Sequence, residues 1–167
     1  MDRDAERWAA VEEATELLLE GEPQAALGEL RAALDADPQN AYAYQYLGVA
    51  LFELERFEAA RDAYRAAVTL SPDYLAAWVG LSHALRQAGD DREAAAAANA
   101  ALERFPDDGD ALYAAGLAEA ACGRRSVARK HLLAFLATKP ELEVQLEVRG
   151  VLEMLAKGHE GDPFRQA

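Results

Sequence analysis

Hydrophobic and small residues recur along this chain at helical spacing, and the whole pattern repeats every 34 residues. Five columns keep this interval without a gap, and they read Pro38, Pro72, Pro106, Pro140; Ala26, Ala60, Ala94, Ala128; Ala33, Ala67, Ala101, Phe135; Ala14, Gly48, Ser82, Gly116; and Gly21, Glu55, Gly89, Gly123. A repeat of this length indicates an array of small helical units that bury their apolar faces by stacking.

Each unit is predicted to hold two antiparallel helices. Small residues such as Gly48 and Ala60 stand where the two helices cross, so that their backbones can approach. The glycine column suits a left-handed cap at the end of each first helix, and the proline column ends each second helix. The predicted pairs cover 7–21 with 24–37, 41–54 with 57–70, 75–88 with 91–104, and 109–122 with 125–138.

The residues within the repeat resemble those of the tetratricopeptide-repeat (TPR) family, whose pattern is W-x2-L-G-x2-Y…A-x3-F…P. The second repeat matches it with Tyr44, Leu47, Gly48, Leu51, Ala60, Tyr64 and Pro72, and the third with Trp78, Leu81, Ser82, Leu85, Ala94 and Pro106. The fourth departs, with Leu112, Ala115 and Glu119 in the Trp, Leu and Tyr places. The resemblance implies an all-α TPR superhelical solenoid of four helix-turn-helix repeats, approximately 7–40, 41–74, 75–108 and 109–140.

Beyond Pro140 the repeat stops, and apolar residues at helical spacing predict one further amphipathic helix over 141–157. The residues expected to cover the open end of the fourth repeat are Leu142, Leu146, Val148, Val151, Leu152 and Leu155. We therefore expect a TPR domain over 1–158 with a C-terminal capping helix, followed by a polar, disordered tail over 159–167.

In the family that the chain resembles, the first helices of the repeats line a concave groove. Carried over, the first repeat contributes Trp8, Val11, Thr15 and Leu18, and the main groove residues are Tyr42, Gln45, Tyr46, Val49, Phe52, Val79, His83, Arg86, Tyr113 and Leu117. The second repeat thus has two apolar faces where its core needs only one, and a contiguous exposed aromatic face usually marks a binding site. Either a partner protein binds there, or the N-terminal segment or another subunit covers it.

Two subtypes of the TPR family can be compared with this chain, the first of them at the groove positions. TPR domains that clamp a chaperone's C-terminal carboxylate use Lys and Asn, whereas here those places hold Val11, Thr15, Gln45 and Val49, so a clamp is not expected. The class II chaperones of type III secretion translocators are similar in size, acidity and a final extra helix, although they commonly have three repeats. The resemblance implies a peptide- or helix-binding adaptor or chaperone.

The formal net charge of −13 argues against nucleic acid and anionic membranes as partners, since both require a basic surface. The chain opens without an apolar signal segment and has no run of about 18 apolar residues. We therefore expect a cytoplasmic protein whose partner is another protein.

Catalytic chemistry is not predicted. The three histidines, His83, His131 and His159, fall on separate segments, and the single cysteine, Cys122, has no histidine near it. No phosphate loop, nucleophile elbow or metal motif appears, so we expect a non-enzymatic protein without cofactor or metal.

Charge is unevenly distributed, because residues 1–40 hold eleven acids against three bases, whereas 109–140 hold two acids against five bases. The basic cluster is Arg124, Arg125, Arg129 and Lys130. Head-to-tail contact between chains would make the protein a self-assembling scaffold, the alternative to a monomeric adaptor. Either a monomer or a weak homo-oligomer is expected.

Overall fold

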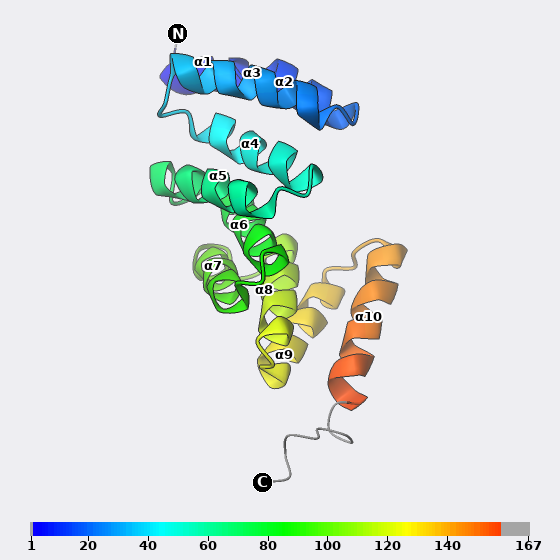
Figure 1. Cartoon of the computed structure of the whole chain (residues 1–167). Coiled ribbons are helices and arrows are strands. Elements are labelled where there is room, and N and C mark those ends of the chain that lie inside the picture. Colours follow the sequence, from blue (N-terminus) through cyan, green and yellow to red (C-terminus); the bar gives the residue numbers. More distant parts are fainter. Residues whose placement is uncertain (1, 158–167) are drawn as a thin grey trace.

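A computed structural model of the chain describes residues 2–157, and all the regular structure in that range is α-helical (Figure 1). The helices are α1 Arg3–Ala9, α2 Glu12–Leu19, α3 Pro23–Ala36, α4 Ala41–Glu53, α5 Phe57–Leu70, α6 Leu75–Gln87, α7 Asp91–Arg104, α8 Gly109–Ala121, α9 Arg125–Ala137 and α10 Leu142–Lys157.

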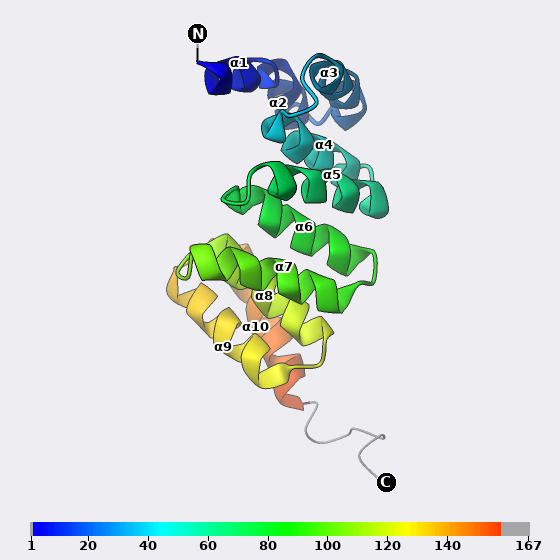
Figure 2. The ribbon, with the colours of Figure 1, turned by 90° about the vertical axis from the view of Figure 1, so that its left-hand side faces the viewer.

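From α3 to α9, each helix packs against the one before it and the one after it, and with α2 these helices build a solenoid of four helix pairs (Figures 1 and 2). The all-α solenoid predicted from the repeat is confirmed, and from α3 to α9 the helix bounds agree with the prediction to within one residue. The packing columns also hold, since Ala60 and Ala94 are 0% exposed. Small residues at these crossings let the helices stack closely.

The solenoid has an inner side formed by the first helix of each repeat. The pairs α2–α4, α4–α6 and α6–α8 are in contact, whereas successive second helices lie farther apart. Because one edge of each repeat is more tightly spaced than the other, the stack curves toward the first helices. Residues on α4, α6 and α8 that point away from the helix pairs therefore face the concave side.

Each first helix ends in the same hydrogen-bonded cap. In the second repeat the Arg56 amide donates to the Leu51 carbonyl at 2.8 Å and the Glu55 amide donates to Phe52 at 2.9 Å, which is the Schellman pattern. The residue at the turn needs a positive φ, and glycine supplies it in three repeats. Glu55 holds φ at 56° in the second repeat, where a side chain makes that conformation costly.

We expect Glu55→Gly to stabilise the protein by about 1 kcal/mol, because glycine adopts this left-handed conformation without the steric cost of a side chain. Thermal unfolding should rise by about 2–4 °C for a chain of this size. The matched control is Gly89→Ala at the equivalent turn, with φ of 88°, which should lower the melting temperature by a similar amount. A fall in stability for both variants would contradict this account of the turn.

The Tyr64 side chain on α5 is wedged between the second and third repeats. A Cβ atom added to Gly48 on α4 would lie 2.6 Å from the Tyr64 ring, and one added to Gly80 on α6 would lie 2.4 Å from it. Tyr64 is only 4% exposed. The equivalent crossing in the fourth repeat pairs Gly116 with Leu132 in the same way, at 2.4 Å. In both repeats a glycine on the first helix faces a bulky residue on the second helix. The small and large side chains therefore compensate each other in volume.

The first helix of the first repeat differs from its prediction, because the expected helix over 7–21 is broken into α1 and α2. The Asn40 side chain donates to the Arg7 carbonyl at 2.9 Å, and this carbonyl would otherwise accept from the Val11 amide. The Val11 amide donates instead to Trp8 at 3.0 Å. A side chain inserted into the helical ladder is a recognised cause of a kink.

Helix α10 packs on α9 through Val148, which is fully buried against Leu132 and Phe135. The expectation that Leu142 and Leu146 also cover the fourth repeat is wrong, since they are 69% and 60% exposed. They stand on the side of α10 opposite to its buried face. The predicted tail, 159–167, lies outside the described residues.

No helix within residues 2–157 combines the length and the apolar character that a membrane span requires.

Candidate functional site

Four aromatic side chains meet at the N-terminal end of the concave side, and we call Trp8, Tyr42, Tyr46 and Tyr74 the aromatic edge cluster. The ring centroids lie 5.5 Å apart for Trp8 and Tyr42, 6.1 Å for Trp8 and Tyr46, and 5.7 Å for Tyr42 and Tyr74. Edge-to-face spacings of this kind stabilise aromatic pairs beyond their burial. The cluster joins α1, α4 and the start of α6 into one surface.

Helix α1 forms one wall of this cluster. The Tyr42 hydroxyl donates to Asp4 at 3.0 Å, and this hydrogen bond, together with burial, raises the pKa of Tyr42. Arg7 holds the same helix against the end of α3 by an ion pair with Asp37, at 2.6 Å. The Trp8 side chain nevertheless stays 40% exposed, which is high for a tryptophan. The N-terminal segment therefore leaves part of the cluster open to solvent.

Tyr74 is a member of the cluster that the groove pattern did not predict. It occupies the helix-cap column, in which Asn40 and Asp108 accept hydrogen bonds from the amides of Ala43 and Ala111. Tyr74 precedes α6 without any side-chain cap. The sequence carries one signal for Tyr74: it is an aromatic residue in a column that otherwise holds the helix-capping residues Asn40 and Asp108. Tyrosine is not a favoured capping residue, so a different role could have been inferred.

The middle of the concave side combines apolar and polar groups from α4 and α6. Val49 and Val79 are partly buried against the core. Gln45 is only 7% exposed, and its Oε1 has no hydrogen-bond partner among residues 2–157. Arg86 Nε is likewise buried without a partner in that range. Unpaired buried polar atoms are costly, so both side chains gain from any partner that reaches them.

His83 is neutral in the folded protein, because burial, assisted by the nearby Arg86 charge, lowers its pKa to about 4. The unfolded chain takes up the proton first, near pH 6.5, so stability should fall as the pH drops from about 6.5 toward 4. Between pH 7 and pH 4.5 the wild-type protein should lose about 2 kcal/mol more unfolding free energy than a His83→Gln variant, because only the wild type has this histidine to protonate. Urea unfolding of both proteins at the two pH values measures this difference. Parallel losses of stability in the two proteins would contradict the assignment of His83 as neutral in the folded protein.

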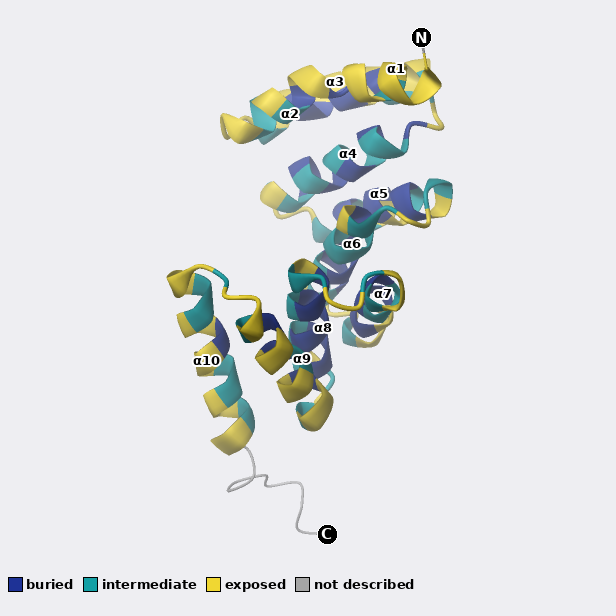
Figure 3. Cartoon of the chain, turned by 180° about the vertical axis from the view of Figure 1, so that it is seen from behind, coloured by how far each residue is buried: buried dark blue, intermediate teal, exposed yellow. Residues whose placement is uncertain are grey.

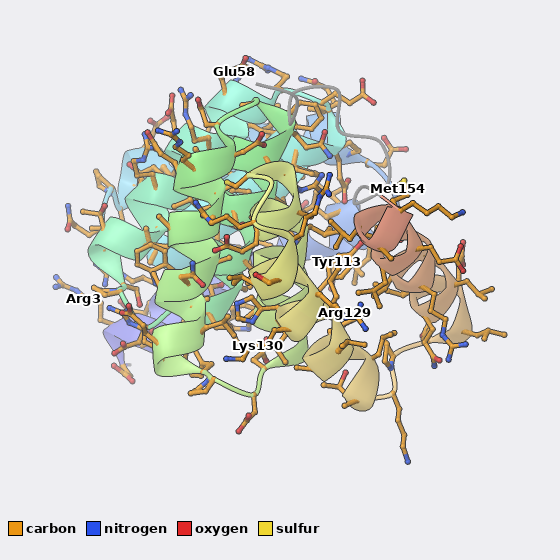
Figure 4. The ribbon with its side chains drawn as sticks, turned by 90° about the horizontal axis from the view of Figure 1, so that it is seen from below. Arg3, Glu58, Tyr113, Arg129, Lys130 and Met154 are labelled. Atoms are coloured by element: carbon orange, nitrogen blue, oxygen red, sulfur yellow. The ribbon has the colours of Figure 1, made fainter. Side chains whose placement is uncertain are left out.

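At the C-terminal end of the concave side, Tyr113 lies between α8 and α10 (Figure 4). Its ring stands 5.9 Å from His83 and 5.1 Å from Phe135, and its hydroxyl donates to Glu147 on α10 at 2.9 Å. Burial and this hydrogen bond raise the pKa of Tyr113 to about 12. Helix α10 therefore borders the concave side and partly covers Tyr113.

The other residues that the sequence assigned to the groove lie outside the aromatic edge cluster. Val11 is fully buried in the core, so its assignment to the groove is wrong. Phe52 packs on Phe57 of α5 at 5.2 Å and is not in ring contact with the aromatic edge cluster. Leu117 is half-buried on α8. The kink after α1 explains Val11, because it turns this residue inward while Trp8 stays at the surface.

In the basic cluster of the fourth repeat, Arg124 is already engaged by an acidic side chain of the same chain. Arg124 bonds the buried Glu119, which also accepts from Asn99 at 3.1 Å. Burial raises the pKa of Glu119, but the two hydrogen bonds outweigh it and leave that pKa lowered. Arg129 and Lys130 are exposed on α9 (Figure 4). Head-to-tail self-association through these residues stays a prediction.

Within the part of the chain that the structure describes, no three His, Cys, Asp or Glu side chains gather closely enough to hold a metal ion. The residues that converge on the concave side are aromatic, aliphatic and hydrogen-bonding. Such a surface can bind an extended or helical segment, with apolar contacts for affinity and polar groups for orientation.

Two family models match the chain, over residues 11–74 and 51–120, and both describe tetratricopeptide repeats. The chain is 35% identical over 74 residues to human Superkiller complex protein 3; the match spans 44% of this chain and 5% of that protein. The chain therefore spans about one twentieth of this relative.

Among solved structures, the crystal structure of MamA matches with a TM-score of 0.72 and 26% identity, covering 80% of this chain and 78% of the other. The first TPR domain of Spaghetti, solved with a bound HSP90 peptide, matches with a TM-score of 0.66 and 22% identity, over 70% of this chain and 93% of that one. The second likeness, at this identity, concerns the fold alone.

Proposed function

This chain belongs to the tetratricopeptide-repeat family, and from this premise we propose that it is a non-enzymatic adaptor or chaperone. It binds an extended or helical segment of another protein on the concave side of α4, α6 and α8. The segment runs from the aromatic edge cluster toward His83 and Arg86. The curvature supports binding on this side, because the first helices form the inner side of the stack.

The observation that carries the proposal is the partial exposure of the aromatic edge cluster. Trp8 keeps 40% of its surface in water although Tyr42 and Tyr46 pack against it. Rigid, amphipathic aromatic side chains are the favoured anchors of protein interfaces, since they bury much area at little entropic cost. An apolar side chain of the partner that packs on Trp8 and Tyr46 would remove this surface from water.

The polar groups in the middle of the surface indicate what the segment offers beyond apolar anchors. Arg86 Nε needs an acceptor, which a backbone carbonyl of the bound segment supplies. Gln45 Oε1 needs a donor, which a backbone N–H of the bound segment supplies. The net charge of −13 disfavours a strongly acidic segment. The expected ligand is an apolar segment with neutral or basic flanks.

The TPR domain of Spaghetti was solved with an HSP90 peptide, which makes peptide binding a property of that domain. The positions where a carboxylate clamp carries Lys and Asn hold Gln45 and Val49 in the second repeat of this chain. We therefore place the ligand in a different class, recognised by apolar anchors and backbone hydrogen bonds.

A random peptide library displayed on phage tests the proposal. Wild-type protein should enrich peptides with one or two aromatic or aliphatic anchors and few acidic residues. The same selection on a Trp8→Ala/Tyr42→Ala variant should enrich none of them, whereas Tyr44→Ala, a change to the neighbouring tyrosine on the other side of α4, should keep them. Equal enrichment by all three proteins would refute the concave site.

A further inference from the structure

Helix α10 carries a second apolar face that the fourth repeat does not use. Leu142, Leu146 and Met154 are 69%, 60% and 68% exposed, whereas Val148 on the inner face is fully buried. The exposed residues and Gly150 follow one another at intervals of four, so they form one stripe along the helix. Figure 3 shows the burial of α10 concentrated on the side toward α9.

Among the described residues, helix α10 lacks the following helix that packs on each of α4, α6 and α8. Helices α4, α6 and α8 are each packed between a preceding and a following second helix, but the main contact of α10 within residues 2–157 is with α9. It stands beside the end of the stack with its outer side uncovered (Figure 1). An exposed apolar stripe on a helix is a surface that a second helix can bury.

We propose that this stripe binds a second copy of the same chain, with α10 lying antiparallel against α10 of the partner across a two-fold axis near Gly150. Gly150 stands at the middle of the 16-residue helix, and a Cβ atom added there would meet nothing within 4 Å. The glycine lets two helix backbones approach at the crossing. Leu146 then meets Met154 of the partner subunit, since each lies four residues, about 6 Å, from the axis.

The charges beside the stripe favour this antiparallel arrangement. Arg149 and Glu153 lie on the same flank of the helix, and a two-fold axis near Gly150 brings that flank against its own copy, so Arg149 lies within one turn of both Arg149 and Glu153 of the partner subunit. Glu143 and Lys157 are each seven residues from Gly150, so the axis sets Glu143 directly opposite Lys157 of the partner subunit. A parallel pair would instead set Glu143 and Lys157 each against its own copy. Exposed ion pairs add little affinity, but like charges select against the wrong orientation.

The contact involves few large apolar side chains, so it belongs to the weak end of protein interfaces. Sedimentation of the full chain should reveal a monomer–dimer equilibrium at about 10–100 µM protein. Leu146→Asp/Met154→Asp should weaken dimerisation at least tenfold without loss of helicity. The matched control is Leu19→Asp, because Leu19 is 88% exposed on α2 and should not affect the dimer. Lys157→Glu should weaken the dimer, and adding Glu143→Lys should restore it.

Cross-linking tests the position of the axis directly. Cys122 is the single cysteine, so Gly150→Cys in a Cys122→Ser background places one thiol per chain. Mild oxidation should give a disulfide dimer at least tenfold faster than for Leu142→Cys, which the antiparallel pair holds far from its copy. A wild-type protein that stays monomeric at 500 µM, or equal cross-linking rates, would overturn the proposal and assign the stripe to a different partner. Peptide binding on the concave side should be unchanged in every one of these variants.

Discussion

Replacing both Trp8 and Tyr42 with alanine is expected to weaken binding of a library-selected peptide by at least about 100-fold. Each aromatic anchor at the centre of an interface contributes about 2 kcal/mol or more, which is roughly 30-fold in affinity. The two rings pack on each other at 5.5 Å, so their effects will not be additive. Isothermal titration with the purified peptide measures the change.

Loss of the Tyr42–Asp4 hydrogen bond will also loosen α1, so the variant needs a structural control. Circular dichroism should show helicity within a few per cent of the wild type, because α1 contributes only 7 residues. Tyr44→Ala removes the same side chain from the same helix, and it should change the affinity less than about threefold. Wild-type affinity in the double variant would move the binding site away from this end of the concave side.

Tyr64→Ala is expected to cost about 3–5 kcal/mol of stability, the largest effect of any single substitution proposed for this protein. The ring is 4% exposed and fills the space between α4 and α6, so its removal leaves a cavity between two repeats. For a chain of this length the melting temperature should fall by roughly 8–15 °C. Thermal unfolding followed by circular dichroism provides the measurement.

A double-mutant cycle separates this packing account from a general loss of core area. Gly80→Ala alone should cost about 1–3 kcal/mol, because the new methyl group would lie 2.4 Å from the Tyr64 ring. In a Tyr64→Ala background the same change should be neutral or slightly stabilising, since alanine favours the helix and partly fills the cavity. Equal costs of Gly80→Ala in both backgrounds would show that the two side chains do not compete for space.

The repeat architecture could be predicted from sequence because it depends on local steric rules. A left-handed turn favours glycine, a helix ends before proline, and a helix crossing requires a small residue, so each rule leaves a column in the sequence. Glu55 marks the limit of such rules, because the turn forms at its φ of 56° even without glycine. Cooperative stacking of the whole array overrides one unfavourable residue.

The parts that could not be predicted depend on contacts between segments far apart in sequence. The break between α1 and α2 follows from one hydrogen bond, between Asn40 and the Arg7 carbonyl, 33 residues apart. The same break buries Val11 and leaves Trp8 at the surface. On α10, periodicity identified the helix but not which of its two apolar faces meets the fourth repeat, since either set of residues has helical spacing.

The central claim, that the concave side binds a partner segment at its aromatic edge, is tested most directly by the fluorescence of Trp8. The chain has two tryptophans, so a Trp78→Phe variant leaves Trp8 as the single reporter. Titration with a tryptophan-free, library-selected peptide should shift the Trp8 emission to shorter wavelength as its exposed surface is covered. The shift should saturate with the dissociation constant that calorimetry gives for the same peptide. Unchanged Trp8 emission while calorimetry still records binding would contradict the account.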